Sequence, residues 1–168
     1  MKTSLLFDFE VDKSSCTVFI KKEFDSDINL VWDAFTKKEI LDRWWAPQLW
    51  ISKTKYMDFK VGGKRFYSMV SPIGQEYWST QNYTSISPKR NFKFTSVFTD
   101  KEENRNSDFP GSEWSMDFIE GDSNTIVGIM VKHQTIATLQ KHVEMGFRQG
   151  FTKTLELLDS LLDELSIK

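Results

Sequence analysis

The chain has 168 residues, the length of one ordinary domain, and 39% of them are hydrophobic, enough to build a core without disulfide or metal support. A single cysteine excludes an internal disulfide, and with only two histidines it argues against a metal or cofactor held by a cysteine and histidine cluster. The net charge of -2 argues against a basic surface for nucleic acid. No uncharged apolar run approaches the roughly 18 residues of a membrane span. Asp8 and Glu10 interrupt the N-terminal segment that would be apolar in a signal peptide. We therefore expect a cytoplasmic protein.

The first 24 residues predict two strands. The first is an extra N-terminal strand over about residues 4–11, because Leu5, Phe7 and Phe9 fall on one face and acidic residues on the other. After a short turn the alternation resumes from Cys16 to Phe24, which predicts a second strand with Cys16 as a small buried hydrophobe on its apolar face.

Two short helices are predicted next. Asp25-Ser26-Asp27 offers N-caps to a helix whose apolar residues recur at intervals of three and four. The capping box Thr36–Glu39 begins a second helix, which we expect to present Trp44 and Trp45 before it ends at Pro47.

The following eighty residues predict a meander of antiparallel strands. Turns that contain Gly or Pro, such as Gly62-Gly63 and Pro72-Ile73-Gly74, recur there at short intervals and separate strand-length segments. The predicted strands cover residues 52–59, 64–71, 76–86, 91–99, 112–120 and 125–132. Before the fifth of these, Asp100–Gly111 is polar and too long for a tight turn, so we expect a surface loop.

The last thirty residues predict one long helix over about residues 137–165, because leucines and aromatic residues recur every three or four positions. Gly146 and Gly150 would then lie one turn apart on the same face, at a cost of about 1 kcal/mol each relative to alanine. They either let the helix approach its neighbours closely or leave room for a ligand, and the sequence does not choose between the two.

This order of elements indicates an α+β fold, in which an antiparallel sheet is covered on one face. The C-terminal helix is the only predicted element large enough to cover it. We therefore expect a single domain over residues 1–168, with a curved sheet wrapped around that helix.

Nucleophilic and metal chemistry has little support in the sequence. His133 follows the last strand and His142 lies on the long helix, at no spacing that marks a triad or a metal pair. Glu76, Glu113 and His133 are candidates for acid–base catalysis by residue type only. No catalytic residue, metal ligand or cofactor is assigned.

Aromatic and thioether side chains predict a pocket for a small hydrophobic molecule. Neighbouring residues on a helix, such as Trp44 and Trp45, point about 100° apart. At least one of the two therefore belongs to the core, while the other can close the rim of a pocket. Which one faces the cavity stays open. The residues expected to line a cavity between the sheet and the long helix are Trp44, Trp45, Trp50, Tyr67, Met69, Trp78, Phe98, Trp114, Met116, Phe147, Gly150 and Phe151.

Several motifs resemble those of a known family: Val31–Thr36 followed by Ile40–Pro47, the strand and turn Met57–Gly63, Ile86–Arg90, and Met145–Phe151. Through them the chain, from about residue 16 to 163, resembles the SRPBCC (START-like, helix-grip) superfamily, in the branch of homologues of the heat-shock-protein-ninety ATPase activator. The resemblance implies a helix-grip fold of about seven antiparallel strands around a long C-terminal helix, with an internal cavity. It implies no set of catalytic residues.

Three functions follow from these observations. The first is binding of a small hydrophobic or aromatic molecule in the cavity, with no assigned reaction. The family name implies a second, a chaperone-ATPase activator or other protein-interaction module, and the superfamily a third, an enzyme of the polyketide cyclase or dehydratase kind. The identity of the ligand and the oligomeric state, a homodimer included, stay open.

Overall fold

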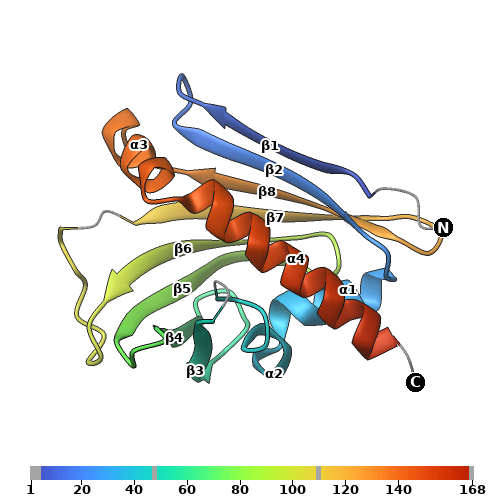
Figure 1. Cartoon of the computed structure of the whole chain (residues 1–168), viewed down its shortest axis with the longest axis horizontal. Coiled ribbons are helices and arrows are strands. Elements are labelled where there is room, and N and C mark those ends of the chain that lie inside the picture. The colour runs from blue at the N-terminus through green and yellow to red at the C-terminus, as the bar shows by residue number, and fades with distance from the viewer. Residues whose placement is uncertain (1–4, 47–48, 109–110, 167–168) are drawn as a thin grey trace.

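The computed structural model describes residues 5–46, 49–108 and 111–166, and Figure 1 shows its elements. Within these ranges eight strands form one antiparallel sheet, in the order β1-β2-β8-β7-β6-β5-β4-β3. The strands are β1 (Phe7–Asp12), β2 (Thr17–Phe24), β3 (Ile51–Met57), β4 (Lys64–Val70), β5 (Glu76–Ser87), β6 (Asn91–Thr99), β7 (Ser112–Glu120) and β8 (Thr125–Lys132). Strands β3 to β8 form a meander, and β2 pairs with β8 so that β1 becomes the opposite edge.

The strands predicted from alternation and turns are confirmed, and the six of the meander agree with the prediction to within two residues at each end. Gly62 and Gly74 occupy the turns with φ of 88° and 86°, a backbone conformation that glycine adopts without steric cost. Cys16 departs from the expectation. It lies in the turn before β2 with φ of 55°, and its side chain is half-buried, because the Asp12 carboxylate holds Ser14 and Ser15 in a turn that extends to Cys16.

Helices α1 (Ile28–Thr36) and α2 (Lys38–Leu41) connect β2 to β3. The Asp27 carboxylate caps α1 by accepting the Leu30 N–H at 3.0 Å, as the sequence predicts. Helix α2 is shorter than expected and ends at Leu41, because the carboxylate of the next residue, Asp42, accepts the Thr54 N–H at 3.0 Å and joins the chain to β3. Both tryptophans that follow therefore leave from a turn and not from the helix itself.

The predicted long C-terminal helix is confirmed as α4 (Phe147–Ser166), but its predicted start near residue 137 is wrong, because residues 136–144 form a separate helix, α3 (Ile136–Glu144). Gly146 has φ of 90° and its N–H donates to the Val143 carbonyl at 3.0 Å, which ends α3 as a left-handed glycine commonly does. Gly146 and Gly150 consequently do not share one helix face. Gly146 precedes α4, and Gly150 lies in its first turn.

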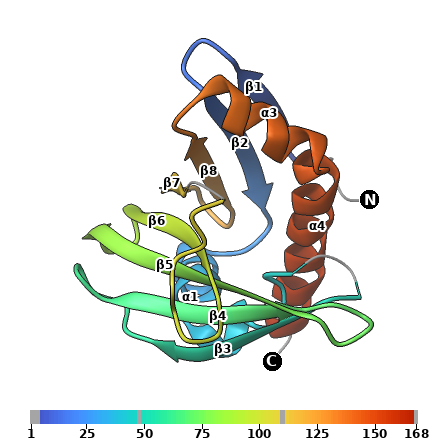
Figure 2. The same cartoon turned by 90° about the vertical axis from the view of Figure 1, so that its left-hand side faces the viewer.

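The sheet curves around α4 and α1, both of which lie on its concave side (Figure 2). Helix α4 crosses this side at full length (Figure 1) and buries Leu155, Leu158 and Leu162. The core beneath is largely aromatic: the Trp32 ring of α1 lies edge-on to Phe118 with ring centroids 4.9 Å apart. No helix in the described ranges is long and apolar enough to cross a membrane.

A smaller aromatic group lies on the other, convex face of β3–β5. The ring of Phe66 stacks on Trp78, with centroids 4.8 Å apart, and meets Tyr56 at 5.7 Å. The predicted polar loop after β6 reaches this group, because Glu103 accepts hydrogen bonds from the Tyr56 hydroxyl and from Lys64. The described part of that loop, residues 100–108, is otherwise mostly exposed.

Candidate functional site

Aromatic side chains from four parts of the chain meet where α4 crosses the middle of the concave face. Trp45 lies 5.7 Å from Trp114 of β7 and 5.8 Å from Phe151 of α4, measured between ring centroids. Phe94 of β6 stacks on Trp114 at 5.5 Å, and Phe147 stacks on Phe151 at 5.3 Å. We call Trp45, Phe94, Trp114, Phe147 and Phe151 the aromatic wall.

Trp44 and Trp45 have different surroundings. The Trp44 side chain is 1% exposed, its Nε1–H donates to the Ala34 carbonyl at 2.9 Å, and its ring packs on Phe35, so it belongs to the core around α1. Trp45 instead donates to the Tyr67 hydroxyl at 3.2 Å and joins the aromatic wall. Of the two, Trp45 is therefore the one that faces the strands of the predicted site.

The other residues expected to line a cavity are only partly brought together. Met116 is buried in the core, and Tyr67 lies beside Trp45. Trp50 packs on Tyr77 at 5.5 Å, away from the aromatic wall, and Phe98 is 41% exposed. Two residues have other surroundings: Met69 of β4 is half-buried against the edge of the core, and Trp78 lies on the convex face against Phe66.

Gly150 is half-buried and stands beside Phe151 on α4. A β-carbon added at this position would have no atom within 4 Å outside its own helix turn. The absence of a side chain here therefore leaves open space and does not serve a close backbone approach.

The concave face also carries a buried cation that the sequence analysis did not single out. Arg65 of β4 is 0% exposed, and its guanidinium lies over the Tyr67 ring, 3.9 Å from Cζ to the centroid. It reaches the Asp42 carboxylate at 3.2 Å and the Thr54 hydroxyl at 3.0 Å. Strand alternation could have found it, because Arg65 shares a face with Tyr67 and Met69.

Tyr83 of β5 adds a second buried polar group. Its ring packs on Phe59 at 4.8 Å and on Phe94 at 6.3 Å, which places it next to the aromatic wall. Its hydroxyl has no hydrogen-bond partner among the described residues. Burial raises the pKa of Tyr83 and the positive charge of Arg65 opposes that rise, so the hydroxyl is protonated at neutral pH.

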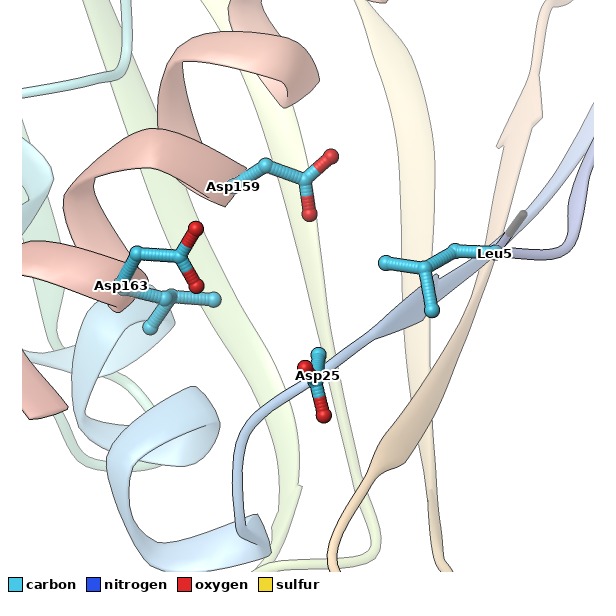
Figure 3. Close-up of a pocket in the computed structure, with 5 residues that line it drawn as sticks. Leu5, Asp25, Asp159 and Asp163 are labelled. Carbon is cyan, nitrogen blue, oxygen red and sulfur yellow. The ribbon is translucent and has the colours of Figure 1, made fainter. Parts of the chain in front are cut away.

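Two hollows on the described part of the chain lie elsewhere. One, of about 220 Å³, is lined by Leu5, Asp25, Asp159, Leu162 and Asp163. The carboxylates of Asp159 and Asp163 point from α4 toward the side of the hollow where Leu5 lies (Figure 3). The other, of about 480 Å³, lies between α1 and the β5–β6 turn and is lined by Ile28, Pro88, Lys89, Arg90, Phe118, Ile119 and Glu120. Neither includes a residue of the aromatic wall, whose rings pack directly on one another.

Of the three groups that residue type alone suggested for acid–base chemistry, only His133 comes near the aromatic wall, through its contact with His142. Glu76 and Glu113 are exposed. His133 is 3% exposed and its Nε2 lies 2.8 Å from Nδ1 of His142, whose ring packs on Phe147 at 4.1 Å. Burial lowers the pKa of both histidines, that of His142 to about 4. Among the described residues no group of three or more His, Cys, Asp or Glu could hold a metal ion.

Comparison with known proteins places the fold. A protein from Arthrobacter aurescens is 25% identical and superposes with a TM-score of 0.89, over 94% of this chain and 91% of that one. A protein from Mycobacterium smegmatis is 25% identical, with a TM-score of 0.85 over 95% of this chain and 97% of that one. The AHSA1 protein from Silicibacter pomeroyi shares the fold. It is 19% identical and superposes with a TM-score of 0.68, over 88% of this chain and 97% of that one.

No curated protein matches the chain. Residues 25–163 match the family model described as activator of Hsp90 ATPase homolog 1-like protein, which confirms the resemblance carried by the sequence motifs. The chain therefore belongs to the family of activator of Hsp90 ATPase homolog 1-like proteins, within the helix-grip superfamily.

Proposed function

We propose that this protein binds a small, flat hydrophobic molecule between the concave face of the sheet and α4, against the aromatic wall. The observation that carries the proposal is the convergence of Trp45, Trp114 and Phe151 from three separate parts of the chain, next to buried polar groups on β4 and β5. Sites for small molecules are commonly built in this way, from aromatic walls with a few polar groups that fix orientation.

Entry of a ligand requires α4 to move away from the sheet, because the rings of the aromatic wall already contact one another. The N-terminal turn of α4 is suited to such a movement. Gly150 presents no side chain there, and Gly146 separates α4 from α3. The ion pairs Lys22–Asp159, at 2.8 Å, and Arg43–Glu164 join α4 to other elements. Both lie in the C-terminal half of the helix, away from this turn.

Tryptophan fluorescence tests the proposal directly. A panel of fatty acids, sterols and polycyclic aromatic compounds is titrated while emission and thermal unfolding are followed. A ligand present at 100 times its dissociation constant is expected to stabilise the fold by about 2.7 kcal/mol. Replacement Trp45→Phe is expected to reduce the change in emission on binding, and Trp114 of the same wall accounts for the remainder.

The matched control is Trp78→Phe, on the convex face of the sheet. This variant is expected to keep the full change in emission on binding. A panel that shifts neither emission nor unfolding temperature contradicts the proposal, and so does a signal that Trp78→Phe abolishes and Trp45→Phe leaves unchanged.

A second candidate, stimulation of a chaperone ATPase, is supported by the description of the family alone. It is tested by adding the protein to a purified chaperone of the Hsp90 class and measuring ATP hydrolysis. A rate that rises with protein concentration and saturates supports it, and a flat titration excludes it for that chaperone.

A further inference from the structure

Arg65 carries a positive charge into the core of the protein. Its side chain is fully buried, between the Tyr67 ring at 3.9 Å and the Trp45 ring at 6.0 Å. Burying a cation is costly unless its charge is balanced and its N–H groups are hydrogen-bonded. The partners of the guanidinium therefore show which of its donors lack an acceptor.

Two of the three guanidinium nitrogens are satisfied within the protein. Nε donates to the Thr54 hydroxyl at 3.0 Å, and Nη2 donates to the Ser52 hydroxyl at 2.9 Å and to the Asp42 carboxylate at 3.2 Å. Nη1 is buried and has no hydrogen-bond partner among the residues that the structure describes. Asp42 accepts from Ser52, Thr54 and Arg65 Nη2, and neither of its oxygens is within hydrogen-bond reach of Nη1.

Tyr83 supplies a second buried donor close by. The register of β4 and β5 pairs Arg65 with Gln81, so Tyr83 stands one diagonal step from Arg65 on the same face. Its hydroxyl is protonated and, within the described ranges, also has no partner. Two adjacent strands thus each present a buried donor group without a partner: Arg65 Nη1 beside Tyr67 and Trp45, and the hydroxyl of Tyr83, whose ring packs on Phe94.

We propose that Arg65 Nη1 and the Tyr83 hydroxyl donate to one oxygen atom of the bound molecule, so that the ligand is a flat hydrophobic compound with a carbonyl or carboxylate oxygen. This inference rests on the proposed function, because it assigns the polar end of a ligand whose apolar body lies against the aromatic wall. A neutral carbonyl satisfies both donors by hydrogen bonding, and a carboxylate adds a charge-assisted bond to the guanidinium.

The test compares ligands of matched shape that differ in one oxygen-bearing group. Three naphthalene derivatives serve: 2-naphthoate, 2-acetylnaphthalene and 2-ethylnaphthalene, with one-ring and three-ring analogues of each. Dissociation constants are measured by calorimetry for the wild-type protein and for Tyr83→Phe and Arg65→Gln. At least one oxygen-bearing ligand is expected to bind at least tenfold more tightly than its ethyl analogue, with the preference lost in both variants and the ethyl analogue changed less than twofold.

The control is Tyr56→Phe, which removes a tyrosine hydroxyl on the convex face and is expected to keep the full preference. Tyr83→Phe keeps the test decisive if Arg65→Gln fails to fold, because it deletes only an unpartnered hydroxyl. A larger gain for naphthoate than for the ketone identifies a carboxylate ligand, and equal gains identify a carbonyl.

Two results would overturn the inference, and only the second of them would also overturn the proposed function. If oxygen-bearing and ethyl ligands bind equally well to the wild-type protein, or the preference survives in Tyr83→Phe, the inference fails while the proposed function stands. If none of the compounds binds, the proposed function fails and this inference fails with it.

Discussion

At the scale of single residues, the structure answers a question that the sequence leaves open at Gly150. The sequence leaves open whether this glycine serves close packing or open space, and the structure favours space, because an added β-carbon has no neighbour within 4 Å outside its own helix turn. Gly150→Ala is therefore expected to raise the free energy of unfolding by about 0.5–1 kcal/mol through better helix propensity. A thermal melt measures the sign, and a clearly lowered unfolding temperature contradicts the assignment of open space.

The larger change Gly150→Leu separates stability from binding. We expect the unfolding temperature to be unchanged or raised, as for alanine, while affinity for hydrophobic ligands is lost because the side chain occupies the space beside Phe151. If instead the leucine overpacks the interface, the fold is destabilised by about 1–3 kcal/mol. The two outcomes differ in sign and need only a melt and a ligand titration.

The buried histidine pair makes stability depend on pH. Burial, followed by the charge of His133, lowers the pKa of His142 from 6.5 to about 4, so the folded protein resists protonation that the unfolded chain accepts. Stability is then complete above pH 6.5 and falls as pH decreases from 6.5 to 4, by at most about 3 kcal/mol for this group. The lowered pKa of His133 acts in the same direction.

Urea unfolding at pH 7.5 and pH 4.5 checks this expectation. Because carboxylates titrate in the same range, the loss of stability in the wild-type protein is compared with that in His142→Asn, which cannot titrate at this position. The variant is expected to lose less on acidification. Identical losses in the two proteins would contradict a role for the histidine pair.

At the scale of elements, the break between α3 and α4 depends on one glycine. Gly146 has φ of 90°, which a residue with a β-carbon adopts only with strain, so Gly146→Ala is expected to destabilise the protein by about 1–2 kcal/mol. The same substitution at Gly150, one turn later, is expected to act in the opposite direction. Paired melts of the two variants measure this contrast, and equal shifts would mean that the backbone at Gly146 relaxes freely.

The elements themselves were largely predictable. Turns with Gly or Pro and alternating faces are local signals, so the bounds of β6, β7 and β8 are predicted to the residue. The apolar stripe of the C-terminal segment is equally local, yet it runs through Gly146 without interruption and hides the break. Helix α2 ended early for a different reason, since the bond from Thr54 to Asp42 is a contact with a distant strand.

At the scale of the whole molecule, the interface between α4 and the sheet holds the core together. Leu158 is fully buried there, whereas Leu157, the preceding residue, is 43% exposed. Leu158→Ala is expected to reduce the free energy of unfolding by about 2–5 kcal/mol. Leu157→Ala is expected to change it by less than about 0.5 kcal/mol. Urea denaturation of both variants provides the comparison, and similar losses would contradict the packing of α4 described here.

The candidate site was predictable only in part. Composition indicates an aromatic interior, and the motifs around Trp44 and Trp45 indicate the family, because both properties are carried by residues close together in the chain. Which tryptophan faces the sheet depends on acceptors from other elements, the Ala34 carbonyl for Trp44 and the Tyr67 hydroxyl for Trp45. Trp78 shows the same limit, because it fits an aromatic pocket by type but stacks on Phe66 on the convex face.

The sequence by itself determined the α+β class, the order of the strands, the place of the two short helices and the family, since each rests on local periodicity or on short motifs. The tertiary structure decided which polar groups are buried in the candidate site. Arg65 is an ordinary charged residue in the sequence, and only the curvature of the sheet, with α2 and β3 folded against β4, encloses it completely. A buried charge is a property of everything packed around it, and that packing brings together residues that no local pattern connects.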